Sequence, residues 1–241
     1  RHRRQGDRQR HPGGRGPLTS IRIFSSDRSC LLLVLSLALV LFTPSLGGRD
    51  LWAPDEPRTG EIAREILTTG SWAVLHLNGR PYVEKPPLYF WLAAAASLPA
   101  GRVSEFTARL PANLAALVGV VCVFYLGRNL FGRRTGALAA VVLATAHGYF
   151  MEARWAHTDM LLACLISIAC LALSQAYRSG GATGWLLVFY LAIGLANLTK
   201  GPLGIVLPIL ALLVFLAGSR DLAFLRRAGL AWGLPLALAP M

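Results

Sequence analysis

Seven apolar blocks, separated by short polar stretches, constrain this sequence more than any other feature. They cover residues 30–46, 110–127, 135–151, 159–177, 184–198, 202–217 and 228–241. Each approaches the length of about 20 residues with which an α-helix crosses the hydrocarbon core of a bilayer. The chain of 241 residues is 54% hydrophobic and only 15% charged, too few charges for a water-soluble surface. We therefore expect an all-α fold, a polytopic bundle of transmembrane helices over residues 30–241 that contacts membrane lipids.

Much of the positive charge lies before the first apolar block. Residues 1–29 contain eight of the 24 basic residues, mixed with Gly and Ser, and we expect a basic, disordered cytoplasmic tail. The other basic residues are scattered between apolar blocks, which argues against a nucleic-acid-binding surface, so no nucleic-acid partner is expected. A cleaved signal peptide is the alternative for residues 30–46. No small-x-small cleavage site is obvious and more spans follow, which favours an uncleaved helix.

The apolar stretch 88–98 decides the topology. Its 11 residues are too few to cross a bilayer, so we expect it to lie in the interface or to re-enter. If it does not cross, fifteen basic residues share the side of the tail and nine face outward; if it crosses, the split is twelve and twelve. The positive-inside rule favours the first arrangement. Nine of the twelve acidic residues then face outward: Asp50, Asp55, Glu56, Glu61, Glu65, Glu84, Glu105, Glu152 and Asp159.

The first outer loop, residues 48–87, is predicted to contain an amphipathic interfacial helix. Asp55-Glu56-Pro57 is typical of a helix start, because Pro in the first turn lacks an N–H that would have no partner there. Gly70 suits the end of that helix. An apolar face and a water-facing charged face are expected, formed by Ile62, Ile66 and Leu67 and by Arg58, Glu61, Arg64 and Glu65.

Charged residues from separate segments meet on this outer side. Each has a structural explanation when taken singly: Asp55 and Asp159 cap helices, Glu84 and Lys85 form a loop salt bridge, and Lys200 is a snorkelling anchor. Their convergence on one face favours a site instead. Carboxylates beside cations, next to lipid, suit an anionic lipid-linked substrate whose phosphate needs a cation and whose chemistry needs a carboxylate.

Five motifs occur in an order that resembles the GT-C superfamily of membrane glycosyltransferases. They are DEPR at 55–58, GRPYVEKPPLYFW at 79–91, TARLP at 107–111, DM at 159–160 and LTKGP at 198–202. Within the superfamily, the sequence is most similar to the aminoarabinose transferases that modify lipid A, with the protein O-mannosyltransferases more distant. The resemblance covers about residues 48–217.

The resemblance implies transfer of a sugar from a polyprenyl-phosphate donor to a lipid A-like or protein acceptor, with inversion, at the periplasmic face of the bacterial inner membrane. It assigns catalysis to the carboxylate of Asp55 and to Lys85, which would neutralise the carrier phosphate. Glu84 is a ligand candidate for a divalent metal ion, and no nucleotide cofactor is implied. The expected substrate-binding residues are Glu56, Arg58, Tyr82, Arg154, Asp159 and Lys200.

Two rival functions are alternatives to this interpretation. A lipid-linked-sugar flippase would place its charges within broken helices at the midplane, whereas the interiors of the predicted spans carry essentially none. A structural assembly subunit would leave the Glu84–Lys85 pair unexplained.

Because the family has further spans and a soluble carboxyl-terminal domain, we expect this chain to be an amino-terminal fragment that would be inactive alone.

Overall fold

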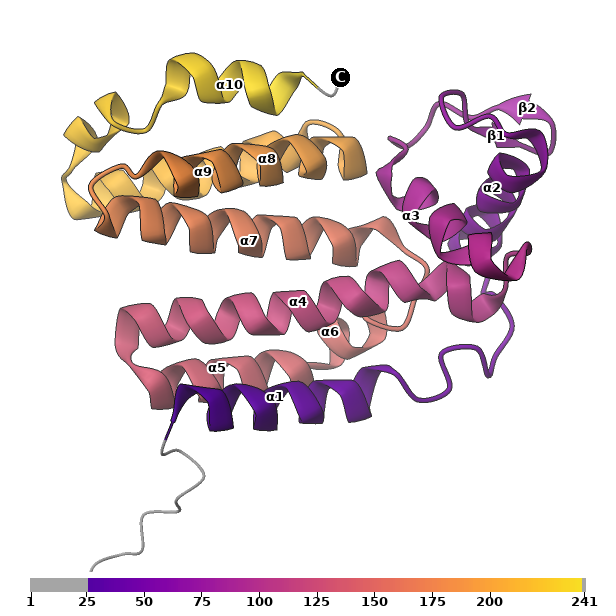
Figure 1. The fold of residues 1–241 in the computed structure, drawn as a ribbon, viewed down its shortest axis with the longest axis horizontal. Coiled ribbons are helices and arrows are strands. Elements are labelled where there is room, and N and C mark those ends of the chain that lie inside the picture. The colour runs from indigo at the N-terminus through magenta and orange to yellow at the C-terminus, as the bar shows by residue number, and fades with distance from the viewer. Residues whose placement is uncertain (1–25, 240–241) are drawn as a thin grey trace, which may run out of the picture.

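The computed structural model describes residues 26–239 and consists almost entirely of helices (Figure 1). The helices are α1 (Asp27–Phe42), α2 (Asp55–Thr69), α3 (Leu88–Ser97), α4 (Glu105–Phe131), α5 (Arg133–Thr145), α6 (His147–Glu152), α7 (Thr158–Arg178), α8 (Thr183–Lys200), α9 (Leu203–Ser219) and α10 (Leu230–Leu238), with 3₁₀ turns at Leu98–Ala100 and Leu222–Arg226. Strands β1 (His76–Leu77) and β2 (Arg80–Pro81) form a short antiparallel hairpin between α2 and α3. The all-α prediction is confirmed.

α1 begins earlier than the predicted boundary of the tail. Ser26 caps the helix, its hydroxyl accepting a hydrogen bond from the Ser29 N–H at 3.1 Å. The Asp27 carboxylate pairs with Arg128 at 2.8 Å and with Arg133 at 2.7 Å. These ion pairs tie the start of α1 to the turn between α4 and α5, so residues 27–29 are helical rather than part of a tail. The remainder of the predicted tail, residues 1–25, lies outside the described residues.

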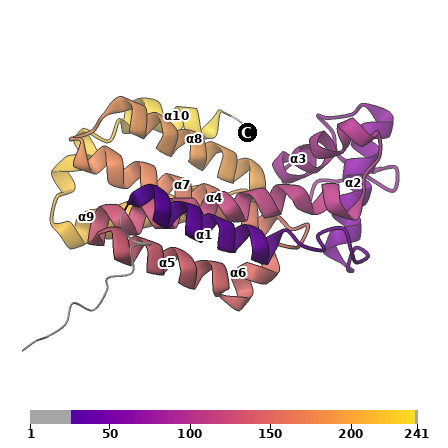
Figure 2. The same cartoon turned by 60° about the horizontal axis from the view of Figure 1, so that its bottom comes forward.

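The long helices stack side by side in one bundle. α1 packs against α4 and α5, α4 packs against α7, and α8 contacts α7, α9 and α10 (Figures 1 and 2). Small residues make the contacts close: a Cβ added to Gly136 on α5 would lie 2.5 Å from the Phe124 carbonyl oxygen of α4. This is the packing expected between helices in a membrane, where small side chains let backbones approach.

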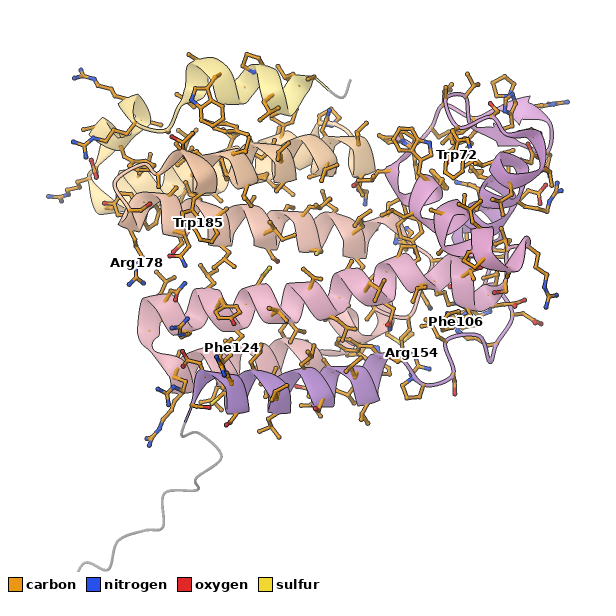
Figure 3. All side chains as sticks on the ribbon, viewed as in Figure 1. Trp72, Phe106, Phe124, Arg154, Arg178 and Trp185 are labelled. Carbon is orange, nitrogen blue, oxygen red and sulfur yellow. The ribbon has the colours of Figure 1, made fainter. Side chains whose placement is uncertain are left out.

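Residues 43–104 form a lobe beyond one end of this bundle, here called the lobe end (Figures 1 and 2). The turns at 153–157 and 201–202 also lie at the lobe end, whereas the turns at 132, 179–182 and 220–229 lie at the opposite end. Figure 3 shows the same separation, with Arg154 and Phe106 at the lobe end and Arg178 and Trp185 at the other. α3 therefore does not cross the bundle, as the first of the two topologies requires.

Three helices within residues 26–239 are long and apolar enough to cross a membrane: α4, α7 and α8. The other predicted spans form shorter helices, and the prediction of one continuous helix over 135–151 is wrong. α5 ends at Thr145, and Ala146 is extended with φ −64° and ψ 125° before α6 begins. α6 is held against α4 by the Tyr149 hydroxyl, which donates to the Ala116 carbonyl at 2.8 Å.

The helix predicted in the first loop is present as α2, and its position in the membrane interface stays a prediction. It ends where Gly70 adopts a left-handed conformation with φ 71°. Ile62 and Ile66 are buried in a small core that α3 shares. The expectation that Glu65 faces water is wrong. Glu65 is buried, and its carboxylate accepts a hydrogen bond from the Gly79 N–H of the hairpin turn at 3.0 Å. That hydrogen bond anchors the hairpin on α2. From the hairpin the chain continues into residues 82–87.

Candidate functional site

Asp55, Lys85, His157, Asp159 and Lys200 form a continuous chain of charged contacts at the lobe end. Asp55 begins α2, and Lys85 precedes the two prolines before α3. His157 caps α7, Asp159 lies in the first turn of α7, and Lys200 ends α8. Four segments far apart in the sequence therefore supply one cluster, and the structure brings together the predicted residues Asp55, Lys85, Asp159 and Lys200.

The Asp55 carboxylate lies among cations. Lys85 Nζ is 3.1 Å from Oδ1, Arg58 Nη1 is 3.8 Å from the same oxygen, and His157 Nε2 is 3.9 Å from Oδ2. Partial burial raises the pKa of Asp55, but the Lys85 hydrogen bond and the charges of Lys85, His157 and Arg58 outweigh it, so the pKa lies below its ordinary value. α2 has no side-chain cap within the described chain, so Asp55 makes its contacts with these cations and does not cap its own helix.

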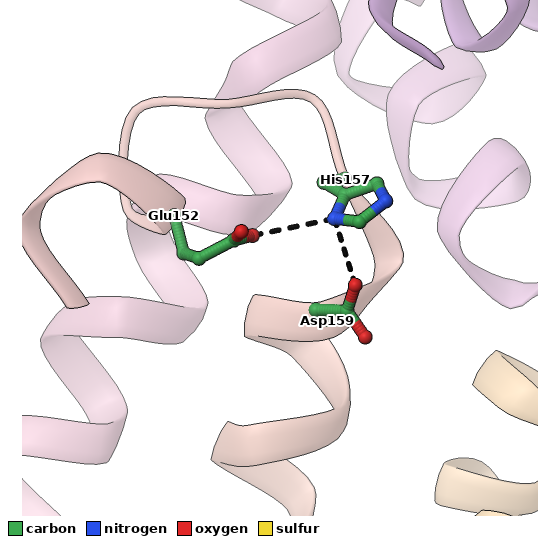
Figure 4. A group of neighbouring side chains, drawn as sticks. All are labelled: Glu152, His157 and Asp159. Atoms are coloured by element: carbon green, nitrogen blue, oxygen red, sulfur yellow. Dashed lines mark hydrogen bonds and ion pairs between the residues drawn. The ribbon is translucent and has the colours of Figure 1, made fainter. Parts of the chain in front are cut away.

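A second carboxylate, Asp159, lies on the other side of His157. His157 Nδ1 is 2.8 Å from Asp159 Oδ2 and 3.3 Å from Glu152 Oε2 (Figure 4). Lys200 forms an ion pair with the other oxygen of Asp159. The hydrogen bonds to Asp159 and Glu152 raise the pKa of His157 to about 9, so the imidazole is positively charged at neutral pH.

Arg58, Tyr82 and Glu84 extend the site along the outer rim. Glu84 is 66% exposed, and its Oε2 lies 3.4 Å from Arg58 Nη1. The Tyr82 side chain is buried against Phe90, and burial raises the pKa of its hydroxyl although the nearby Arg58 guanidinium acts to lower it. Tyr82 and Glu84 therefore both lie close to Arg58.

Glu56 has a different environment from its neighbour. Its carboxylate is 4% exposed and accepts from six donors: Arg109 Nε at 2.7 Å, Arg109 Nη2 at 2.9 Å, Arg49 Nη1 at 2.7 Å, Arg49 Nη2 at 3.4 Å, the Trp52 N–H at 2.8 Å and the Ala156 N–H at 2.9 Å. Burial raises the pKa of Glu56, but these bonds outweigh it and lower the pKa to about 2. Glu56 therefore joins α2, α4 and the turn before α7, and its predicted contact with substrate stays a prediction.

Arg109 is the fully buried partner of Glu56. It also donates to three backbone carbonyls of the loop after α1: Leu46 at 2.7 Å, Arg49 at 2.9 Å and Asp50 at 2.9 Å. Its side chain thereby fixes the loop that leads into Asp55. TARLP at 107–111 marks this position in the sequence, but nothing local in that motif indicates a partner 53 residues away.

Arg154 lies apart from the charged cluster. Its Nη2 donates to the Pro44 carbonyl at 2.9 Å, and its guanidinium lies over the Phe150 ring at 5.1 Å. No hydrogen bond or ion pair of the described chain connects it to Asp55, Lys85 or Asp159. The structure thus does not bring Arg154 together with the other predicted site residues, and its substrate-binding role stays a prediction.

Two hollows border the cluster. One is lined by Trp52, Ala53, Pro54, Asp55, Glu56, Trp155 and His157. Trp52 and Trp155 meet edge to face there, with ring centroids 6.4 Å apart. The other lies between α3 and the α8–α9 turn and is lined by Ala73, Pro86, Pro87, Trp91, Asn197, Leu198, Gly201 and Pro202. Lys85 and Lys200 immediately precede lining residues of this second hollow, which is mostly apolar.

Glu152, His157 and Asp159 are the described residues whose ligand atoms lie close enough together, within 4.8 Å, to hold a metal ion. Their contacts suit a protonated imidazole better, because Nδ1 points at both carboxylates and Lys200 already pairs with Asp159. We assign no metal to them. Glu84, the predicted metal ligand, lies outside this group and has Arg58 as its partner, so that role stays a prediction.

Residues 84–241 match a family described as dolichyl-phosphate-mannose-protein mannosyltransferase. The match covers well over half of the sequence. The chain belongs to this family. This match confirms the resemblance of the five motifs to membrane glycosyltransferases.

Individual proteins similar to this chain support a narrower relationship. Two are called undecaprenyl phosphate-alpha-4-amino-4-deoxy-L-arabinose arabinosyl transferase. The protein from Edwardsiella ictaluri is 31% identical over 76% of this chain and 34% of its own length. The protein from Erwinia tasmaniensis is 33% identical over 80% of this chain and 35% of its own length. The chain thus spans about a third of the length of these relatives.

Solved structures share the fold. ArnT from Cupriavidus metallidurans, bound to undecaprenyl phosphate, superposes with a TM-score of 0.78 and 33% sequence identity, covering 87% of this chain and 39% of that one. An Archaeoglobus fulgidus oligosaccharyltransferase superposes with a TM-score of 0.64 over 79% of this chain and 26% of that one. At 15% identity, the second likeness concerns the fold alone. The helical membrane fold expected from the sequence is confirmed.

Sequence reasoning missed His157 and Glu152 as members of the cluster. His157 stands between Ala156 and Thr158, where its pattern is that of an ordinary loop histidine before a helix. An available signal was its position two residues before Asp159, which puts both side chains at the start of one helix. The approach to Asp55, 102 positions earlier, has no local signal.

Proposed function

We propose that the protein containing this chain is a membrane glycosyltransferase that moves a sugar from a polyprenyl-phosphate carrier to an acceptor at the lobe end. The contact that carries the proposal is the 3.1 Å pair between Asp55 Oδ1 and Lys85 Nζ at the rim of a hollow. A carboxylate and an ammonium group in contact are what transfer from a phosphate carrier needs. The names of the arabinosyl transferase relatives, and the undecaprenyl phosphate bound to ArnT, support the same chemistry.

Lys85 is assigned to the leaving group. As the bond from the anomeric carbon of the sugar to the carrier oxygen breaks, its electron pair stays on the phosphate, which gains negative charge. The Lys85 ammonium group, with Arg58 beside it, stabilises that charge. Lys200 is the other lysine of the described cluster, and it forms an ion pair with Asp159.

Asp55 is assigned to the acceptor. A hydroxyl acceptor forms a new bond to the anomeric carbon from the face opposite the leaving phosphate, and its proton passes to the Asp55 carboxylate. The low pKa of Asp55 keeps the carboxylate ionised for this step. If the acceptor is a phosphate, it is already ionised, and Asp55 positions it and balances positive charge at the reacting carbon.

The acceptor is proposed to be a lipid of the lipid A class. The arabinosyl transferase names favour this over a protein acceptor, although the family description names a protein acceptor. Arg58 and Lys200 are proposed to bind the phosphate, and Tyr82 and Asp159 are proposed to bind the sugar. The sugar arrives activated by its carrier phosphate, so no nucleotide cofactor is proposed.

The lobe end is proposed to face the periplasm of a bacterial inner membrane. Charge supports this orientation, because fifteen of the 24 basic residues belong to the side of the opposite end and nine to the lobe side, and the positive-inside rule expects the cytoplasm where basic residues are more numerous. Eight of the fifteen precede residue 30, and the other seven are Arg128, Arg133, Arg134, Arg178, Arg220, Arg226 and Arg227.

The flippase alternative fits the described chain less well. Asp159 and Lys200 lie at the ends of α7 and α8 on the lobe side, and Arg109 is tied to Glu56 near the start of α4. Between these ends, α4, α7 and α8 carry no acidic or basic residue in their middle turns. A translocation path would need polar groups at that depth.

We propose that Glu84 binds a divalent metal ion together with further ligands from elsewhere in the full-length protein. Binding of Mn²⁺ to purified protein, followed by isothermal titration with Glu84→Gln as the comparison, tests it. Equal binding by both proteins would remove Glu84 as a ligand.

The function is tested with full-length protein in vesicles, supplied with radiolabelled polyprenyl-phosphate sugar and a lipid acceptor. We expect label on the acceptor and release of polyprenyl phosphate in equal amounts. Movement of the labelled carrier across the bilayer without any labelled acceptor would favour the flippase.

A further inference from the structure

His157 is the side chain that connects the two carboxylates of the cluster. Its Nε2 lies 3.9 Å from Asp55 Oδ2, and its Nδ1 lies 2.8 Å from Asp159 Oδ2. Glu152 holds the same Nδ1 at 3.3 Å. Figure 4 shows how the two acidic side chains approach one ring nitrogen from two helices, leaving the other nitrogen of the ring turned away from both.

The orientation of this ring is fixed by its surroundings. The backbone of His157 is extended, with φ −132° and ψ 146°, at the position that caps α7. Its side chain is 22% exposed and lines the same hollow as Trp52, Trp155 and Asp55. Turning the ring would break the contacts of Nδ1 with Asp159 and Glu152, so Nε2 stays directed to Asp55.

The position of Lys85 creates a need for such a partner. In the structure, Lys85 Nζ is 3.1 Å from Asp55 Oδ1. The proposed function assigns this same ammonium group to the carrier phosphate. When the phosphate engages Lys85, the pairing with Asp55 weakens, and Arg58 at 3.8 Å is itself shared with Glu84. His157 is the remaining cation in contact with Asp55, and its own anchors, Glu152 and Asp159, are not phosphate ligands.

We propose that His157 is a positioning residue that holds the Asp55 carboxylate in its reactive orientation while Lys85 engages the carrier phosphate. His157 touches neither the sugar nor the phosphate in this arrangement; it acts through Asp55. The inference rests on the proposed function. It predicts that loss of the Nε2 contact lowers the rate of the chemical step and leaves carrier binding intact.

Two substitutions separate this role from a purely structural one. The side-chain amide of Asn reaches the place of Nδ1, so His157→Asn keeps a donor for Asp159 and Glu152 but loses the group that faces Asp55. The amide of Gln reaches the place of Nε2, so His157→Gln keeps a donor toward Asp55 and loses the other contacts. Positioning of Asp55 requires Gln to be the better replacement, and a structural anchor for the two carboxylates requires Asn to be better.

The experiment measures kcat for transfer, the KM for the carrier and carrier binding in full-length wild type and both variants. We expect His157→Asn to lower kcat on the order of 10- to 100-fold, as a misplaced reacting group does, with carrier affinity within about threefold of wild type. His157→Gln should retain more kcat than His157→Asn. His147→Asn, at an exposed position at the start of α6, is the matched control and should behave as wild type.

Three outcomes would overturn the proposal. They are kcat of His157→Asn within about twofold of wild type, equal or greater loss in His157→Gln, and a loss that appears only in KM. Absence of transfer by the wild-type protein is a different failure. It would contradict the proposed function itself. Without transfer by the wild-type protein, carrier binding by the variants could not support a catalytic role for Asp55 or a positioning role for His157.

Discussion

Arg109 and Glu56 form a buried, bidentate ion pair, with Nε 2.7 Å from Oε1 and Nη2 2.9 Å from Oε2. The pair joins α4 to the helix that begins with Asp55, and Arg109 holds the preceding loop through three carbonyls. Removing Glu56 would leave the buried Arg109 without a counterion, and removing Arg109 would leave the buried Glu56 with only the partly exposed Arg49 as a cation. The pair therefore determines where Asp55 lies although neither residue belongs to the charged cluster.

Arg109→Ala should destabilise the protein by about 3–5 kcal/mol, the usual cost of breaking a buried ion pair from one side. Arg109→Lys should recover little of this, because an ammonium group cannot reproduce the bidentate fork. The free energy of unfolding in detergent measures the effect. Arg64→Ala, which breaks the exposed pair with Glu61, is the control and should change stability little. Equal stability of the Arg109 and Arg64 variants would contradict the assignment.

Stability should also depend on pH through Glu56. Its pKa falls from 4.5 in the unfolded chain to about 2 in the folded protein, so the folded state favours the ionised form. This contribution, of the order of 3 kcal/mol, is fully present above about pH 4.5 and is lost as the pH falls toward 2. Unfolding midpoints measured from pH 7 to pH 3 should decrease more for wild type than for Glu56→Gln. Parallel curves for the two proteins would show that Glu56 does not contribute.

The topology can be tested with cysteines at Ser71 in the lobe and Ser179 in the turn after α7. The structure places these residues at opposite ends of the bundle. Ser179 suits labelling because it is exposed and serine resembles cysteine in size. We expect a membrane-impermeant maleimide to label Ser71→Cys in intact cells and to label Ser179→Cys only after the membrane is permeabilised. Labelling of both in intact cells would contradict the expected orientation.

Lys85→Ala should lower transfer by about 100- to 1,000-fold in the full-length protein, the range for loss of a group that stabilises developing negative charge. The amount of protein in the membrane should change far less, because Lys85 makes one partly exposed ion pair. Lys85→Arg should be only partly active, since a planar guanidinium does not replace a compact charge. Transfer by the alanine variant within about twofold of wild type would remove Lys85 from the site.

Local patterns predicted the elements that depend on nearby residues. The start at Asp55-Glu56-Pro57 and the glycine at position 70 bounded α2 correctly, because proline in a first turn and glycine after a last turn act within one helix. Glu65 was placed on the wrong face. Its spacing along α2 does not reveal the N–H of Gly79 in a hairpin folded back on the helix.

Contacts between distant segments were beyond local patterns. Asp55 and Glu56 are adjacent acids, yet one faces Lys85 in a partly exposed cluster and the other is buried against Arg109. The packing of α2 on α4 and on the turn before α7 separates their roles. Arg154 shows the converse, since a charged residue near Asp159 in sequence turns instead to the Pro44 carbonyl.

The central claim is that Asp55 acts as the reactive carboxylate, and Asp55→Asn tests it most directly. The substitution keeps the shape and removes the charge, and α2 does not depend on this side chain for a cap. In full-length protein we predict transfer reduced by more than about a hundredfold, because an amide cannot accept the acceptor proton, with carrier binding retained through Lys85. Near-normal transfer by Asp55→Asn, measured beside carrier binding on the same sample, would contradict the account.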